Sequence, residues 1–224
     1  MSEPRPDETR DLVAELARDL SPVERIARLR TAAARILGVW ALLTIAALLG
    51  KGLTANLSDP EQMTSGFGAI LAGSALVGVG SLLAALAASV PGRERTAWVA
   101  GAFGLSGALI AVALGAFLLT GDPTASRPAR WDSDMACLIL ACLVALLPAA
   151  GALLYVVRAA PARPVSILLS VGAGCVALGA VTAQLGCADT AFRHLLVSHA
   201  LAPAIGAALF VTPLWLGFQR LRDR

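Results

Sequence analysis

Four cysteines and two histidines give this sequence its most reactive side chains. Thiolates and imidazoles bind zinc-like metal ions, and two neighbouring thiols can form or exchange a disulfide. The stretch SDMACLILAC at 133–142 holds the first two cysteines, and the other four residues lie in and after a later apolar run. Which of these reactions is available depends on the depth of each residue in the fold. The six residues are Cys137, Cys142, Cys175, Cys187, His194 and His199.

The elements that position these residues have the composition of membrane helices. The chain is 57% hydrophobic and 15% charged, with a mean hydropathy of +0.75, which is too apolar for a soluble globule of its size. Apolar runs of about 18 or more residues are typical of transmembrane helices. We therefore predict an all-α, polytopic membrane protein, a bundle of six transmembrane helices. Their approximate ranges are 32–50, 66–90, 97–120, 136–157, 164–186 and 195–218.

The charged residues predict three regions and an orientation. Residues 1–31 carry thirteen charges and show no cleavable signal peptide, so we expect a short N-terminal arm there. Residues 32–218 form the transmembrane domain, and residues 219–224 form a basic tail. Fourteen of the eighteen basic residues fall on the N-terminal side of the membrane. The positive-inside rule therefore predicts that both termini are cytoplasmic.

The arm contains the pattern of an amphipathic helix. Ser21-Pro22-Val23-Glu24 is a capping box with proline at the first helical position, so one helix is expected over about 8–20 and a second from Pro22. A protein partner with a basic groove would fit the acidic first helix, and a solvated helix without a partner is the alternative. The apolar residues on one side of the arm are Leu12, Val13, Leu16, Leu20 and Val23.

Helix geometry predicts which cysteines lie at the same depth. Cys137 and Cys187 are each 25 residues from Ala162, in the middle of a short hairpin, so a rise of about 1.5 Å per residue brings both to one height at the external end. A disulfide between them is therefore plausible. Cys142 and Cys175 differ in depth by roughly 10 Å, too much for a disulfide, and we interpret them as packing residues.

Several roles remain open for the external pair. Cys137 and Cys187 can be small buried apolar residues, a permanent disulfide on an oxidising face, or part of a metal site with His194 and His199. The spacing matches no standard zinc motif. His199, below the surface, also fits a hydrogen-bonded residue of the bundle.

The chain resembles the NrsF-type membrane anti-sigma factors, the negative regulators of sigma F. The resemblance spans nearly the whole chain and rests on DLVAELARDLSPV in the arm, ALLPAAGALLYVVRAAPARP around the hairpin, and LGCADTAFRHLLVSHALA after the fifth helix. One position departs from the family pattern, since VSHALA lacks the tryptophan expected before His199.

This resemblance implies a non-enzymatic regulator in the bacterial inner membrane. Its arm would hold an extracytoplasmic-function sigma factor inactive, and it would contact membrane lipid but no nucleic acid directly. Two periplasmic-side thiols, Cys137 and Cys187 by position, would respond to heavy-metal or oxidative stress. No resident cofactor is implied, although a heavy-metal ion could bind the thiol pair transiently.

Three other classes of protein fit parts of the pattern. A small metal-binding transporter or channel would use the cysteines as a metal site, but no Asp, Glu or Lys lies in the core of any predicted helix, where such proteins usually need one. A membrane enzyme would need converging acid–base groups, which only the external Cys, His and Asp residues offer. A structural protein with a constitutive disulfide would show no stimulus-dependent partner.

Overall fold

A computed structural model describes residues 14–15, 27–51, 66–119, 131–187, 189 and 191–223, and these residues form helices and turns without a strand. Six helical segments are long and apolar enough to cross a membrane, which confirms the predicted all-α fold class. The first five are α2 (Leu29–Lys51), α4 (Gly66–Ala88), α5 (Glu94–Leu119), α6 (Trp131–Ala159) and α7 (Pro164–Leu185). The sixth consists of α8 (Phe192–Leu195), η2 (Leu196–Ala200) and α9 (Ala202–Arg222).

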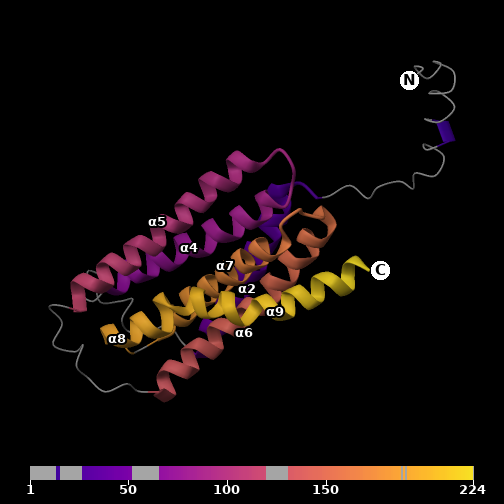
Figure 1. The fold of residues 1–224 in the computed structure, drawn as a ribbon. Coiled ribbons are helices and arrows are strands. Elements are labelled where there is room, and N and C mark those ends of the chain that lie inside the picture. The colour runs from indigo at the N-terminus through magenta and orange to yellow at the C-terminus, as the bar shows by residue number, and fades with distance from the viewer. Residues whose placement is uncertain are drawn as a thin grey trace.

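Helix α7 is the centre of the bundle (Figure 1). Of its membrane-spanning segment 72% is buried, against 22% for α2 and for α5, and α4, α6 and α9 pack around it. Its sequence is rich in glycine and alanine, which lets neighbouring helices approach closely without a hydrophobic driving force from water. Gly179 shows how close α6 comes, since an added Cβ would lie 2.0 Å from the carbonyl oxygen of Ala141.

Helices α4 and α5 form a tightly packed pair at one side of the bundle (Figure 1). A Cβ on Gly80 would lie 2.4 Å from the backbone nitrogen of Gly104, so only glycine permits this contact. The outer face of α5 leaves Phe103 and Leu105 about three-fifths exposed, at 58% and 63%. Such a face is suited to lipid rather than water.

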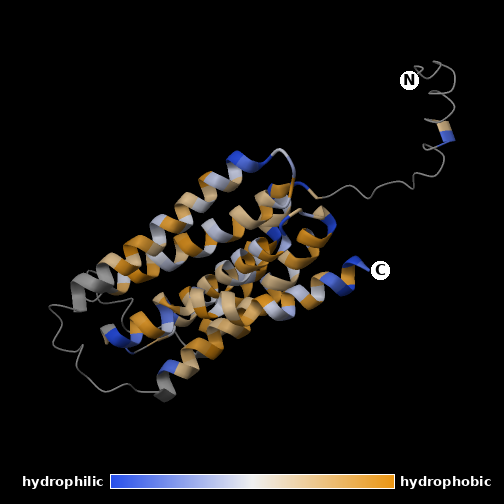
Figure 2. Ribbon diagram, viewed as in Figure 1, coloured by the Kyte–Doolittle hydropathy of each residue, from blue (hydrophilic) through white to orange (hydrophobic). Residues whose placement is uncertain are grey.

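The two ends of the bundle differ in charge. The start of α2, the α4–α5 turn, the α6–α7 turn and the C-terminus lie together (Figure 1), and we call this the basic end. Figure 2 shows apolar residues along the middles of the helices and polar residues near their ends. The basic residues of this end are Arg28, Arg30, Arg93, Arg95, Arg158, Arg163, Arg220 and Arg222.

The sixth span, predicted from the sequence over about 195–218, is irregular near its start. A π-helical turn, η2, interrupts it, and the Leu201 N–H donates to the Leu196 carbonyl at 2.9 Å. Pro203 explains the interruption, because its nitrogen has no hydrogen to donate and its ring would clash with the carbonyl four residues earlier. That carbonyl belongs to His199, so the irregular turn contains one of the two histidines of the chain.

Most of the predicted arm lies outside the described residues. Ala14 and Glu15 are helical and exposed. The apolar stripe, by contrast, has no described member: Leu12, Val13, Leu16, Leu20 and Val23 all lie outside the described residues. The prediction for the arm therefore stays a prediction.

Candidate functional site

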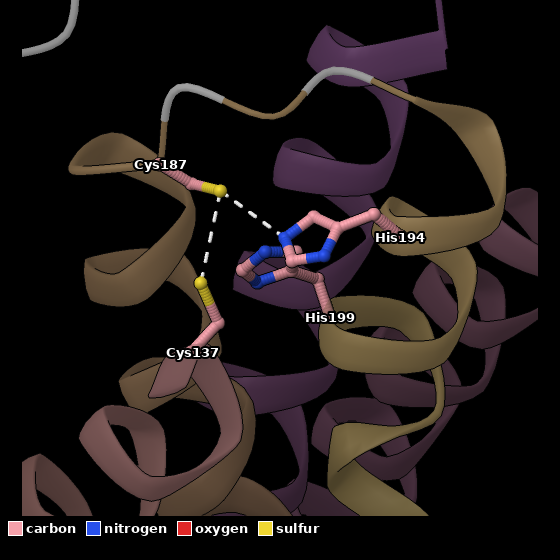
Figure 3. A group of neighbouring side chains, drawn as sticks. All are labelled: Cys137, Cys187, His194 and His199. Carbon is pink, nitrogen blue, oxygen red and sulfur yellow. Dashed lines mark hydrogen bonds between the residues drawn. The ribbon is translucent and has the colours of Figure 1, made fainter. Parts of the chain in front are cut away.

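Four buried side chains converge (Figure 3) at the end of the bundle where α8 lies, opposite the basic end (Figure 1). Cys137 lies in the second turn of α6, Cys187 directly after the end of α7, His194 in α8 and His199 in η2. The structure thus brings together both cysteines and both histidines that the sequence singled out. All four are at most 8% exposed.

The distances within this group are short. Cys137 Sγ and Cys187 Sγ lie 3.7 Å apart, and Cys187 Sγ lies 3.1 Å from His194 Nε2. One ligand atom from each of the four residues lies within 4.8 Å of every other. We call these four residues the Cys2His2 cluster. A hydrogen bond from Cys137 Sγ, and not a disulfide, links the two sulfurs in the structure.

His194 is held from its outer side by a buried carboxylate. Its Nδ1 lies 2.5 Å from Asp134 Oδ1, and Ser198 Oγ donates to the same oxygen at 3.1 Å. Asp134 is 6% exposed, so its charge is compensated inside the protein, as a buried carboxylate requires. The carboxylate accepts the Nδ1 hydrogen and turns the Nε2 atom toward Cys187.

His199 is held in the same way by the backbone. Its Nδ1 lies 3.2 Å from the carbonyl oxygen of Ala180 in α7. A carbonyl oxygen can only accept, so Nδ1 carries the hydrogen and Nε2 keeps a lone pair. His199 is fully buried, and its Nε2 has no hydrogen-bond partner among the described residues.

Cys187 has an environment that favours the thiolate. The hydrogen bond that Cys137 Sγ donates to it holds the pKa of the Cys187 thiol far below its usual range. Burial raises this pKa, but the contact with His194 lowers it again, and the lowering prevails. A thiolate is the form of cysteine that attacks disulfides and binds metals.

The cluster supports three kinds of chemistry. The sulfur pair can be oxidised to a disulfide. The order Cys187–His194–Asp134 places a nucleophile, a base and a carboxylate that orients the base, as in thiol nucleophiles generally. Cys137 and His199 also add two donor atoms to those of Cys187 and His194. These four residues together have the composition of a tetrahedral metal site.

The other two cysteines lie away from the cluster. Two residues around the cluster, Asp134 and Ser198, make contacts that the sequence did not predict. Cys175 is fully buried in the core and Cys142 packs against it, in agreement with packing roles. The sequence analysis grouped the external Asp residues with the Cys and His residues but missed the pairing of Asp134 with His194. Ser198 was missed altogether, although its place four residues after His194 puts both on one helical face.

A polar contact joins α2 to α7 inside the bundle. Trp40 Nε1 donates to the Leu178 carbonyl at 2.9 Å and to Thr182 Oγ1 at 3.2 Å. Thr44 Oγ1 and Thr182 Oγ1 lie 2.7 Å apart. Helix α2 follows the arm in the chain, and α7 ends beside Cys187, so this contact lies between the two functional regions that the sequence predicted.

Comparison with known proteins gives one family. The family model described as "NrsF: Negative regulator of sigma F" matches residues 16–218. This range covers the first five spanning segments in full and the sixth except for its last four residues. No curated protein and no solved structure matches the chain.

Proposed function

The chain belongs to the NrsF family, the negative regulators of sigma F, and from this premise we propose that it holds an extracytoplasmic-function sigma factor inactive at the bacterial inner membrane. The observation that carries this proposal is the family match over residues 16–218, nearly the whole chain. The six apolar spans provide the membrane attachment. The proposed orientation has both termini and the basic end in the cytoplasm, in line with the positive-inside rule.

In this proposal the arm is the sigma-binding element. Leu12, Leu16 and their apolar neighbours would lie in a groove of the sigma factor, in the way that amphipathic helices bind apolar grooves. An isolated helix of about a dozen residues is marginal in water, so binding to the sigma factor would stabilise a helix in the arm. The sigma factor would then be unavailable to RNA polymerase.

The stimulus would act on Cys137 and Cys187 at the periplasmic end. An oxidant such as hydrogen peroxide would convert the two thiols to one disulfide, with two protons and two electrons passing to the peroxide to form water. The sulfurs would have to approach from 3.7 Å to the bonded distance of about 2.05 Å. That movement of about 1.6 Å is large for a closely packed core, so α6 and the end of α7 would shift against each other. Heavy-metal ions would act on the same thiols by coordination.

The route from this site to the arm would pass through α7 and α2. A shift of α7 changes the position of the Leu178 carbonyl and of Thr182, which hold Trp40 on α2. Because α2 continues from the arm, its movement would alter how the arm meets the sigma factor. The stimulus must favour one of two packings of the bundle for this to work.

Co-purification tests the proposal. The full chain in detergent is expected to retain the sigma factor encoded beside its gene, whereas Leu12→Glu/Leu16→Glu is expected to lose it, because two charges on the apolar face cannot be buried in a groove. Glu15→Gln is the matched control, since it lies in the same segment and is exposed. Absence of binding by the intact chain, or equal binding by the double variant, would remove the arm from the mechanism.

A further inference from the structure

The Cys2His2 cluster contains a buried polar atom that the fold leaves without a partner. His199 Nε2 carries a lone pair and has no hydrogen bond among the described residues, although the ring is 0% exposed. An unsatisfied buried acceptor of this kind is destabilising. It faces the other three members of the cluster (Figure 3), where a metal ion would satisfy it.

The spacing of the sulfurs matches tetrahedral coordination. Two sulfurs bound to one zinc ion at about 2.3 Å each lie about 3.8 Å apart in a tetrahedron. Cys137 Sγ and Cys187 Sγ lie 3.7 Å apart. The sulfur–nitrogen edge of such a site is about 3.6 Å, so the 3.1 Å between Cys187 and His194 would lengthen by about half an ångström.

Both histidines are oriented as metal-binding histidines usually are. Such a histidine donates its outer N–H to a carboxylate or a carbonyl, and this bond fixes the ring with its other nitrogen toward the metal. Asp134 plays this part for His194, and the Ala180 carbonyl plays it for His199. Two independent second partners of this kind in one cluster are difficult to explain by packing alone.

We propose that Cys137, Cys187, His194 and His199 form a tetrahedral site for one borderline divalent cation of the Zn²⁺ type. Cys137 would release its thiol proton on binding, Cys187 would bind as a thiolate, and the two thiolates would neutralise the two charges of the ion. A neutral complex of this kind is compatible with a buried site. Zinc needs no redox partner here, and its four protein ligands close the site as in structural zinc centres.

The cation would tie together segments that are far apart in the chain. Cys137 belongs to α6, Cys187 follows α7, and the histidines belong to α8 and η2. A bound ion would therefore fix the packing of three spans at this end of the bundle. This regulatory meaning rests on the proposed function, because a thiol-reactive metal or an oxidant would have to displace the ion to change that packing.

Metal binding can be measured without a sigma factor. Reduced full-length protein, purified in detergent and equilibrated with buffered Zn²⁺, is expected to retain one zinc ion per chain after gel filtration. Cys137→Ser and His199→Gln are expected to weaken binding by at least about 100-fold, since each removes a ligand. Asp134→Asn is expected to weaken it by about 10–100-fold, because it loosens His194 alone. Cys142→Ser, one helical turn further along α6, is the matched control and should bind zinc as the parent does.

Cobalt substitution gives a second readout that does not depend on stability. Co²⁺ in the parent protein is expected to show the visible bands of tetrahedral coordination and the ultraviolet band of thiolate ligation, and His199→Gln should lose the tetrahedral pattern. Zinc retention that is unchanged in both Cys137→Ser and His199→Gln, or no retention by fully reduced parent protein, would overturn the proposal. If the same preparation still retains the sigma factor, the failure concerns the metal site and leaves sequestration intact.

Discussion

Replacing Gly179 by alanine tests whether close packing of α6 and α7 sets the geometry of the thiol pair. The new Cβ would lie 2.0 Å from the Ala141 carbonyl oxygen, whereas ordinary contacts begin near 3.4 Å. The backbone cannot rotate out of the way as a side chain could, so the two helices must separate by about 1.4 Å at this point. Ala141 lies one turn beyond Cys137, so the same displacement would widen the 3.7 Å sulfur separation to about 5 Å.

The expected result is a slower disulfide and a less stable bundle. Overpacking of this kind costs about 1–3 kcal/mol. If that strain also opposes the approach of the sulfurs, the rate of Cys137–Cys187 disulfide formation falls about 5- to 150-fold, as peptide mapping by mass spectrometry can measure under a mild oxidant. Gly38→Ala is the control, because nothing lies within 4 Å of its added Cβ. A Gly179→Ala protein that forms the disulfide at the parent rate and unfolds at the parent temperature would refute this reasoning.

Three further predictions concern other parts of the same structure. Trp40→Phe removes two hydrogen bonds to α7, so we expect the free energy of unfolding to fall by about 1–3 kcal/mol. In this variant, oxidation of the thiols should no longer release the sigma factor. Because the pKa of Cys187 is lowered, its rate of modification by a small methanethiosulfonate in metal-free protein should change little between pH 8 and pH 6. A reference peptide thiol with an ordinary pKa of about 8.5 would slow about 75-fold, and an equal slowing of Cys187 would contradict the thiolate assignment. Pro203→Ala restores the missing N–H, so η2 should relax toward α-helix and move the His199 ring. The expected result is a lower affinity for zinc with unchanged reactivity of the two sulfurs.

The sequence predicted the fold and the pairing of the thiols because both follow from fixed dimensions. A membrane of constant thickness requires spans of about 20 residues, and a constant helical rise places Cys137 and Cys187 at one depth. The 3.7 Å separation of their sulfurs agrees with that argument. Neither step needs any knowledge of which helix faces touch.

The remaining contacts of the site depend on those faces and could not be read from the sequence. Apolar residues surround each spanning helix, so hydrophobic periodicity does not indicate which side of α6 or α7 is buried. The pairing of Asp134 with His194 is a contact between distant segments and follows only from the packing. The position of His199 depends on the π turn at Pro203, and a proline in a helical pattern indicates a distortion without fixing its form.

The distribution of the cluster along the chain has a consequence for biosynthesis. Its members span residues 137 to 199 and belong to the last three membrane segments. While the protein is being made, the two thiols are therefore present before the second histidine has left the ribosome, and a complete cluster exists only after the final segment has been inserted. A nascent or truncated chain lacks the arrangement that holds Cys187 in its reactive state. The complete cluster is thus acquired only together with the completed assembly of the bundle.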